Sequence, residues 1–238
     1  MSDLTVLPIT VEHHREPLGI GETTPRISWM TRTDLPDWRQ AAYELEIEPE
    51  DGEAWSSGRV DSAESVLVPW GASPLRSRER RSVRARVWGE GAAEPSAWSE
   101  DVVVEAGLLD PADWAAQLAR PILPEELEEP VLLLRREFVL DRPVARARLY
   151  ATAQGVFDAE INGSAAGEDV LAPGWTSYRH RLRYSTHDVT GLLVEGSNAL
   201  GVSLADGWFR GHVGFTGTRA HYGDRTGVLL QLLSLIHI

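Results

Sequence analysis

The chain has 238 residues, and its 36 acidic residues outnumber 23 basic ones, giving a formal net charge of −13. Cysteine is absent, which excludes a disulfide framework, a thiolate nucleophile and a cysteine-ligated metal site. The acidic balance disfavours general nucleic-acid binding, while 42% hydrophobic residues are enough for a folded core.

The N-terminal part of the chain, residues 1–107, has the pattern of short strands. Apolar and charged residues alternate strictly in Tyr43–Glu48 and in Val83–Val87, and turn-rich pieces separate them from two further runs, Ser65–Pro69 and Asp101–Glu105. Strands of this length and spacing predict a β-sandwich of the fibronectin III or immunoglobulin type.

A basic run in this region has two interpretations. It comprises Arg76, Arg78, Arg80, Arg81, Arg84 and Arg86. The run could bind phosphate or an anionic polymer, or it could form a solvated strand face opposite Glu44, Glu46 and Glu48. The net charge favours the second interpretation.

Residues 108–130 are predicted to be a linker. Asp110 and Pro111 are a suitable start for a short helix reaching Leu118, and Pro121 would stop it. The acidic, proline-bounded stretch that follows, ending at Pro130, is typical of a connecting segment.

Residues 131–232 again show strand patterns. Alternation recurs in Ala145–Tyr150 and in Phe157–Ile161, which runs into Asn162-Gly163, a strong hairpin signal. Three further runs are Leu182–Tyr184, Leu200–Leu204 and Val228–Leu232. The predicted fold class is therefore all-β, with a second, jelly-roll-like β-sandwich.

Sequence signals of catalysis are weak, whereas two aromatic loops stand out. Trp175 and Trp208 each follow a glycine in a turn-like context. An exposed tryptophan can stack on the apolar face of a sugar, while a nearby Asp or Arg binds hydroxyls. Alternatively, both tryptophans are inward-facing core residues. The candidate carbohydrate-binding residues are Trp175, Tyr178, Asp206, Trp208 and Arg210.

No metal or cofactor is expected from the residue patterns. His13 and His14 are adjacent and would point apart on a strand, and the sequence has no phosphate-binding glycine loop or nucleophile motif. The start of the chain lacks a basic segment followed by an apolar stretch, and no apolar run is long enough to span a membrane. These features predict a cytoplasmic protein without nucleic-acid or membrane partners.

Ordered motifs along both regions resemble the bacterial α-L-rhamnosidases of the large inverting type, glycoside hydrolase family seventy-eight. The motifs of the first region are Pro25–Trp29, Gln40–Tyr43, Trp55–Val60, Arg84–Trp88 and Ser96–Glu100. Those of the second are Ile161–Gly163, Leu171–Tyr178, Asp188–Thr190, Asn198–Gly201, Asp206–Gly211 and Tyr222–Arg225.

The resemblance implies an accessory N-terminal region of an enzyme that hydrolyses terminal α-L-rhamnosyl linkages with inversion. In that family, the general acid and base lie in an (α/α)₆ barrel that this sequence lacks, so they map onto no residue here. The implied partners are rhamnosylated glycosides or polysaccharides, bound by the full-length enzyme, and the missing C-terminal catalytic domain. Some members of the family carry a calcium-dependent rhamnose-binding insertion ahead of the second sandwich; it is expected to be absent here, so calcium is not implied. The rival interpretation is a stand-alone carbohydrate-binding or adhesion module.

The end of the chain departs from the family pattern at about Leu233. Residues 233–238 do not resemble the expected continuation of the strand and are predicted to be a non-native tail. We therefore expect the second sandwich to be incomplete at its C-terminus.

Overall fold

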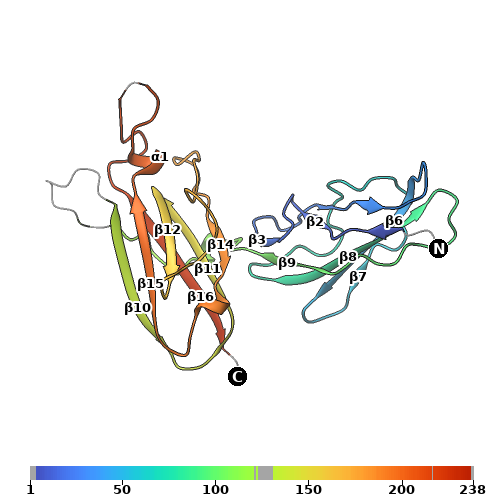
Figure 1. Ribbon diagram of the computed structural model, residues 1–238, viewed down its shortest axis with the longest axis horizontal. Coiled ribbons are helices and arrows are strands. Elements are labelled where there is room, and N and C mark those ends of the chain that lie inside the picture. The colour runs from blue at the N-terminus through green and yellow to red at the C-terminus, as the bar shows by residue number, and fades with distance from the viewer. Residues whose placement is uncertain (1–3, 121, 123–130, 216, 237–238) are drawn as a thin grey trace. The chain divides into compact units, whose positions relative to one another are not determined.

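The computed structural model describes residues 4–120, 122, 131–215 and 217–236 (Figure 1). Contacts divide the chain into unit 1, Met1–Asp113, and unit 2, Trp114–Ile238. Nearly all the regular secondary structure of each unit is β-strand, and the predicted all-β fold with two β-sandwich domains is confirmed. In the described part of the chain, no helix is long and apolar enough to cross a membrane.

Unit 1 packs one large sheet against two short strand pairs. Its strands are β1 (Thr5–Val6), β2 (Thr10–Val11), β3 (Leu18–Ile20), β4 (Ile27–Ser28), β5 (Thr31–Arg32), β6 (Gln40–Pro49), β7 (Trp55–Ser56), β8 (Arg80–Gly89) and β9 (Val102–Ala106). The five-stranded sheet has the order β3-β9-β8-β6-β7, and β1-β5 and β2-β4 form the pairs. The alternating apolar residues of β6 and β8, such as Leu45 and Val83, point into a core shared with Val11 and Ile27 of the small pairs.

The predicted strand at Ser65–Pro69 is wrong. The structure has only an isolated bridge there, in which Val68 and Ile27 exchange two backbone hydrogen bonds. Leu67 has a φ of +53°, which interrupts the extended conformation that a strand needs. The apolar run therefore covers the core without joining the ladder.

The basic run of unit 1 is largely engaged in ion pairs with nearby carboxylates. Antiparallel pairing of β6 and β8 places Glu44 opposite Arg86 and Glu46 opposite Arg84, and both pairs form salt bridges. Glu48 instead lies opposite Ser82. Cross-strand pairs of this kind stabilise a sheet, which supports the interpretation of the run as a strand face.

Two tryptophans, Trp88 and Trp98, stack on the guanidinium groups of the same arginines. The guanidinium of Arg86 lies 4.5 Å from the ring centroid of Trp98 and 5.5 Å from that of Trp88, and the guanidinium of Arg84 lies 4.9 Å from Trp98. Each arginine thus has a carboxylate on one side and an indole on another, which restricts its rotamers.

Replacement of Trp98 by alanine is expected to lower the free energy of unfolding of unit 1 by about 2 kcal/mol, because two cation–π contacts are lost together. Trp98→Phe keeps an aromatic face and should lose less than half of that. Urea unfolding followed by far-ultraviolet circular dichroism measures both, since this signal does not depend on the indole. Equal losses in the two variants would contradict the stacking role.

The helix predicted to run from Asp110 to Leu118 is also wrong. Only a 3₁₀ turn, η1 (Pro111–Asp113), forms, and Asp113 closes it by accepting hydrogen bonds from the Asp110 N–H and the Ser77 hydroxyl. The next amides, Ala115 and Ala116, donate to the side chain of Gln231. Their donors are therefore used outside a helix, and the chain stays irregular. Residues 121 and 123–130, in the rest of the predicted linker, lie outside the described residues.

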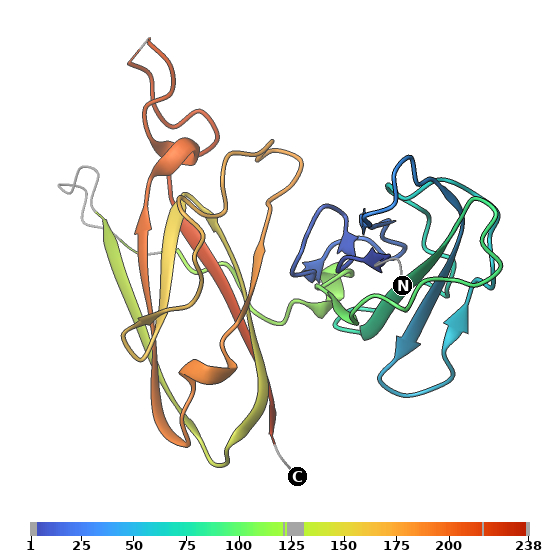
Figure 2. The same ribbon diagram turned by 45° about the vertical axis from the view of Figure 1, so that its right-hand side comes forward.

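Unit 2 is a sandwich of a four-stranded and a three-stranded sheet (Figure 2). Its elements are β10 (Leu132–Leu140), β11 (Val144–Gln154), β12 (Val156–Ile161), β13 (Ser164–Ala165), β14 (Ser185–Asp188), η2 (Thr190–Leu192), β15 (Gly196–Ala205), α1 (Gly207–Arg210) and β16 (Gly227–Ile236). The sheet orders are β10-β15-β12-β13 and β14-β11-β16. Leu149 and Val228 from one sheet pack against Ile161 and Leu204 from the other.

The predicted hairpin at Asn162-Gly163 is confirmed. Ile161 pairs with Ser164, and both turn residues have positive φ, +53° and +81°. These angles suit the two-residue turn for which Asn-Gly is favoured. The side chain of Asn162 adds hydrogen bonds to Leu192, Asn198 and Ala199.

Two predicted strand boundaries need correction. Leu182–Tyr184 is irregular, and the strand begins at Ser185, because the carbonyl of Arg183 accepts from the hydroxyl of Thr152 and the Tyr184 ring packs edge-on against Trp114. At the end of the chain, the strand does not stop at Leu232. Residues 233–236 continue β16 in register with β11, while residues 237–238 lie outside the described part.

Candidate functional site

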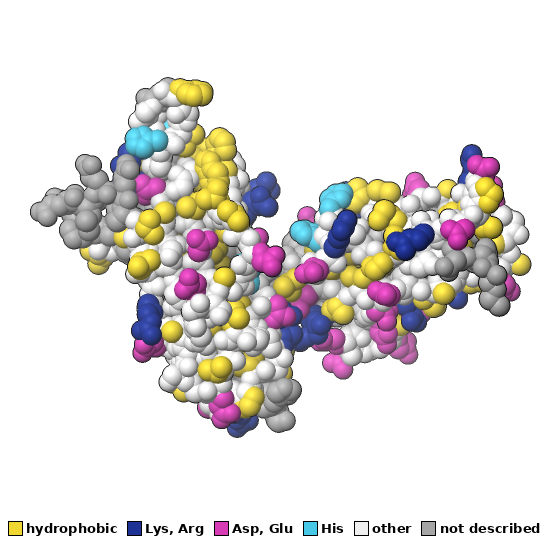
Figure 3. All heavy atoms as spheres, viewed as in Figure 1, with side chains coloured by type: hydrophobic (Ala, Val, Ile, Leu, Met, Phe, Trp, Pro, Cys, Tyr) yellow, Lys and Arg dark blue, Asp and Glu magenta, His cyan; other side chains and the backbone are white. Residues whose placement is uncertain are grey.

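Two loops meet at one end of unit 2, beside α1. The first loop, residues 166–184, follows β13, and the second, residues 211–215 and 217–226, follows α1. Figure 3 shows hydrophobic side chains gathered at this end of the unit. Several large apolar residues of these loops are exposed, among them Val170, Leu171, Trp175 and Phe215. The site is therefore built on loops that a rigid sandwich supports.

A cluster of three aromatic rings holds the two loops together. Tyr178 is buried, and its ring lies 5.2 Å from Phe209 and 4.9 Å from Tyr222, measured between centroids. Phe209 is also buried and meets Tyr178 edge-on, an arrangement that aromatic pairs prefer. Burial raises the pKa of Tyr178, and the nearby Tyr222 adds to the effect. The Tyr178 hydroxyl donates to the Gly174 carbonyl over 3.3 Å.

Trp175 is exposed, whereas Trp208 is only partly so. Trp175 is 54% exposed to solvent, and its Nε1–H donates to the Tyr222 hydroxyl over 3.2 Å. Trp175 is therefore a fixed surface ring and not a core residue. In α1 the buried ring is Phe209, and Trp208 beside it is half-buried.

Asp206 joins two arginines beneath the loops. One carboxylate oxygen accepts from Arg210 over 2.9 Å and the other from Arg219 over 2.8 Å. Arg210 also donates to the Asp224 carbonyl over 2.9 Å. All three side chains are at least 70% buried, so the network anchors α1 to the second loop.

A pocket of about 450 Å³ opens between the loops. Its lining residues are Ser177, Arg179, His180, Val213, His221 and Tyr222. Hydroxyl, imidazole and guanidinium groups of this kind can exchange hydrogen bonds with a polyhydroxylated ligand. Tyr222 links this pocket to the exposed ring of Trp175.

The five candidates from the sequence thus separate into two kinds. Trp175 lies at the surface, while Tyr178, Asp206 and Arg210 hold the loops in place and Trp208 is half-buried beside them. Sequence reasoning missed Phe209, Tyr222 and Arg219. One available signal was Tyr222-Gly223: a Cβ on Gly223 would lie 2.6 Å from the Phe209 ring, so the ring needs a glycine there.

A second, smaller pocket of about 230 Å³ contains His187 of β14. Burial lowers the pKa of His187, and the Asp169 carboxylate, 3.9 Å from Nε2, only partly opposes this. Across the described residues, no group of three or more His, Asp or Glu side chains is placed to hold a metal ion.

His187 is expected to make unit 2 less stable in mild acid. Its pKa is below 6.5 when folded and about 6.5 when unfolded, so between these values the unfolded chain binds more protons. The free energy of unfolding should therefore fall as the pH drops below about 6.5 and level off above it. Urea unfolding across this pH range should show the slope in the parent chain and lose it in His187→Gln. A slope retained in that variant would assign it to another group.

Comparison with known proteins identifies both units. Residues 6–110 match the family model of the Rha78A-like, N-terminal immunoglobulin domain, and residues 142–236 match that of the alpha-L-rhamnosidase N-terminal domain. An α-L-rhamnosidase of Formosa agariphila is 35% identical over 93% of this chain and 25% of its own length. The chain therefore spans about a quarter of this curated relative.

Solved structures agree with these matches. The α-L-rhamnosidase of Aspergillus terreus is 43% identical, with a TM-score of 0.87 over 97% of this chain and 27% of that protein. The Streptomyces avermitilis enzyme, solved with L-rhamnose, has a TM-score of 0.89 over 98% of this chain and 39% of that protein. At 23% identity it supports the fold alone. The resemblance seen in the sequence is confirmed: the chain carries the two N-terminal β-sandwich domains of the α-L-rhamnosidase family.

Proposed function

We propose that this chain is the accessory N-terminal region of an α-L-rhamnosidase whose full-length form hydrolyses terminal α-L-rhamnosyl linkages with inversion. The observation that carries the proposal is the order of the two domain matches, which together reproduce the N-terminal part of such enzymes. The substrates would be rhamnosylated glycosides or polysaccharides, and the partner would be the catalytic domain of the longer protein. We assign no catalytic residue within this chain.

A chimera tests the accessory role. Residues 1–238 would replace the matching region of the Aspergillus terreus enzyme, and activity would be measured on an aryl α-L-rhamnoside. We expect the chimera to keep activity, a version without the region to lose it, and the isolated chain to be inactive. Proton NMR of the first sugar released should show the inverted anomer. Full activity without the region, or hydrolysis by residues 1–238 alone, would contradict the proposal.

We further propose that the loop surface around Trp175 contacts carbohydrate. An exposed indole, fixed by Tyr222 and next to a polar pocket, suits stacking on a sugar ring. If the chain acts instead as a stand-alone carbohydrate-binding module, this same surface is where the sugar would bind.

Sugar binding should quench tryptophan fluorescence through Trp175. Titration of the chain with L-rhamnose or an α-L-rhamnoside is expected to give saturable quenching that Trp175→Ala abolishes. Trp208→Ala should weaken it less, because that ring is half-buried. Trp98→Phe, a change in unit 1, serves as the control and should leave the affinity unchanged. Quenching that survives Trp175→Ala would place the binding site elsewhere.

A further inference from the structure

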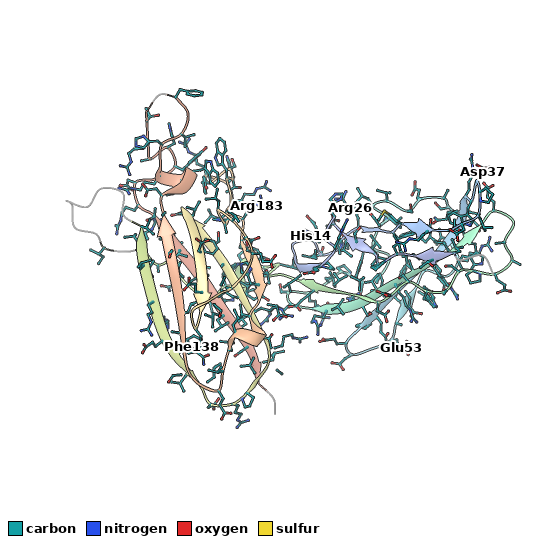
Figure 4. All side chains as sticks on the ribbon, viewed as in Figure 1. His14, Arg26, Asp37, Glu53, Phe138 and Arg183 are labelled. Carbon is teal, nitrogen blue, oxygen red and sulfur yellow. The ribbon has the colours of Figure 1, made fainter. Side chains whose placement is uncertain are left out.

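The strand β10 forms an open edge of unit 2. It has nine residues, and in the described residues its ladder partner is β15 on one side only. Figures 1 and 2 both show β10 as the outermost strand of its sheet, and Figure 4 labels Phe138 on it. A long, regular edge of this kind is a ready template for another strand.

The direction of the backbone groups on β10 follows from its neighbours. The Asn162 N–H donates to the Ala199 carbonyl, so Ala199 faces β12, and the next residue, Leu200, faces β10. Leu200 lies opposite Arg136, so the N–H and C=O of Arg136 point toward β15. Backbone groups alternate along a strand, and four residues therefore direct theirs to the open edge: Leu133, Arg135, Glu137 and Val139.

The side chains of these four residues are also exposed. Leu133 is 81% exposed to solvent, and Val139 is 73% exposed. Arg135 and Glu137 form an ion pair at 2.5 Å, with side chains 65% and 68% exposed. Along the exposed face of the strand, the order is thus an apolar residue, an arginine, a glutamate and a second apolar residue.

We propose that β10 pairs antiparallel with β10 of a second copy of this chain, about a twofold axis at Arg136. This register sets Leu133 opposite Val139 of the second copy, and Arg135 opposite its Glu137. It also brings together the backbone groups that point to the open edge, and on the opposite sheet face it sets apolar Leu134 against Phe138. The two four-stranded sheets become one continuous sheet.

The neighbouring registers are much less favourable. An axis at Arg135 sets this arginine against its own copy and Leu133 against Glu137. An axis at Glu137 sets two glutamates together and Arg135 against Val139. Like charges directly opposite destabilise a strand pair, and opposite charges stabilise it. The charge order therefore selects the register centred on Arg136.

One contact in the proposed register is unfavourable and provides a test. Arg136 faces its own copy across the axis, where the side chains of a pair without backbone hydrogen bonds lie close. Arg136 is exposed, so its long side chain can turn toward water. Arg136→Thr removes the repulsion and should tighten the dimer several-fold.

Charge reversal tests the proposal on the intact 238-residue chain. Sedimentation velocity over a wide concentration series is expected to show reversible dimerisation. Arg135→Glu and Glu137→Arg should each raise the dissociation constant about tenfold, because each turns both charge pairs into like charges. The double variant, carrying both changes, should return the constant to near the parent value. Glu160→Arg, an exposed strand position of the same sheet, is the matched control and should change little.

Circular dichroism of every variant checks that the fold is retained. A chain that stays monomeric at all concentrations leaves β10 to another occupant and overturns the proposal. If the dissociation constant of the dimer does not change in the two single charge-reversal variants, the dimer forms through another surface, such as the edge of β16, and the proposal is overturned. Failure of the double variant to recover would reject the register centred on Arg136.

Discussion

Phe209→Ala is expected to lower the free energy of unfolding of unit 2 by about 3 kcal/mol. Phe209 is 4% exposed and meets the buried ring of Tyr178 edge-on. Gly223 lies so close to the tip of the Phe209 ring that an added Cβ would sit 2.6 Å from it. The space left by alanine would be bounded by two loops, so the loss combines the missing ring with weakened contact between them.

Phe215→Ala is the matched control for this prediction. Phe215 is in the loop that follows α1 and is fully exposed, so its removal should change stability by less than about 0.5 kcal/mol. Urea unfolding of both variants, followed by circular dichroism, gives the comparison. Similar losses in the two variants would show that Phe209 does not hold the loops together.

Phe209→Ala also has an expected consequence for sugar binding. Phe209 supports Tyr178, Tyr178 packs on Tyr222, and Tyr222 holds the Trp175 indole. Phe209→Ala should therefore weaken rhamnoside-induced quenching even in conditions where the chain remains folded. An unchanged affinity in the folded variant would separate the position of Trp175 from this aromatic cluster.

Local patterns in the sequence were sufficient for the long alternating strands of unit 1 and for the tight hairpin of unit 2. The alternation of Tyr43–Glu48 and Val83–Val87 comes from side chains pointing to opposite faces of a sheet, and both segments lie within long strands. Asn162-Gly163 was equally reliable, because few residue pairs accept positive φ at both positions. These signals need only neighbours along the chain.

The candidate site depends on contacts between distant segments, which local patterns do not report. Tyr178, Phe209 and Tyr222 meet only after the sandwich brings their loops together. Whether Trp208 or Phe209 would be the buried ring of α1 depends on that packing as well. The same holds for the tail: residues 233–236 lie in a strand because β11 offers them partners.

Gly155→Ala is expected to destabilise unit 2 by more than about 3 kcal/mol. Gly155 makes the turn between β11 and β12 with a φ of +146°, and a Cβ there would lie 2.4 Å from the carbonyl oxygen of Ala205. That oxygen belongs to the backbone of β15 and cannot turn aside. Relief of the clash would require a shift between strands that pack in the core.

Gly163→Ala separates the cost of the backbone angle from the cost of the clash. Gly163 also has positive φ, +81°, but a Cβ there would meet no atom within 4 Å. Its substitution should therefore cost only the left-handed conformation, about 1–2 kcal/mol. Thermal and urea unfolding should therefore show the larger loss for Gly155→Ala, which adds the clash with the Ala205 carbonyl to the cost of a positive φ. Equal losses would mean that β12 and β15 can move apart at little cost, and that the sandwich holds its site loops less rigidly than the packing around Gly155 implies.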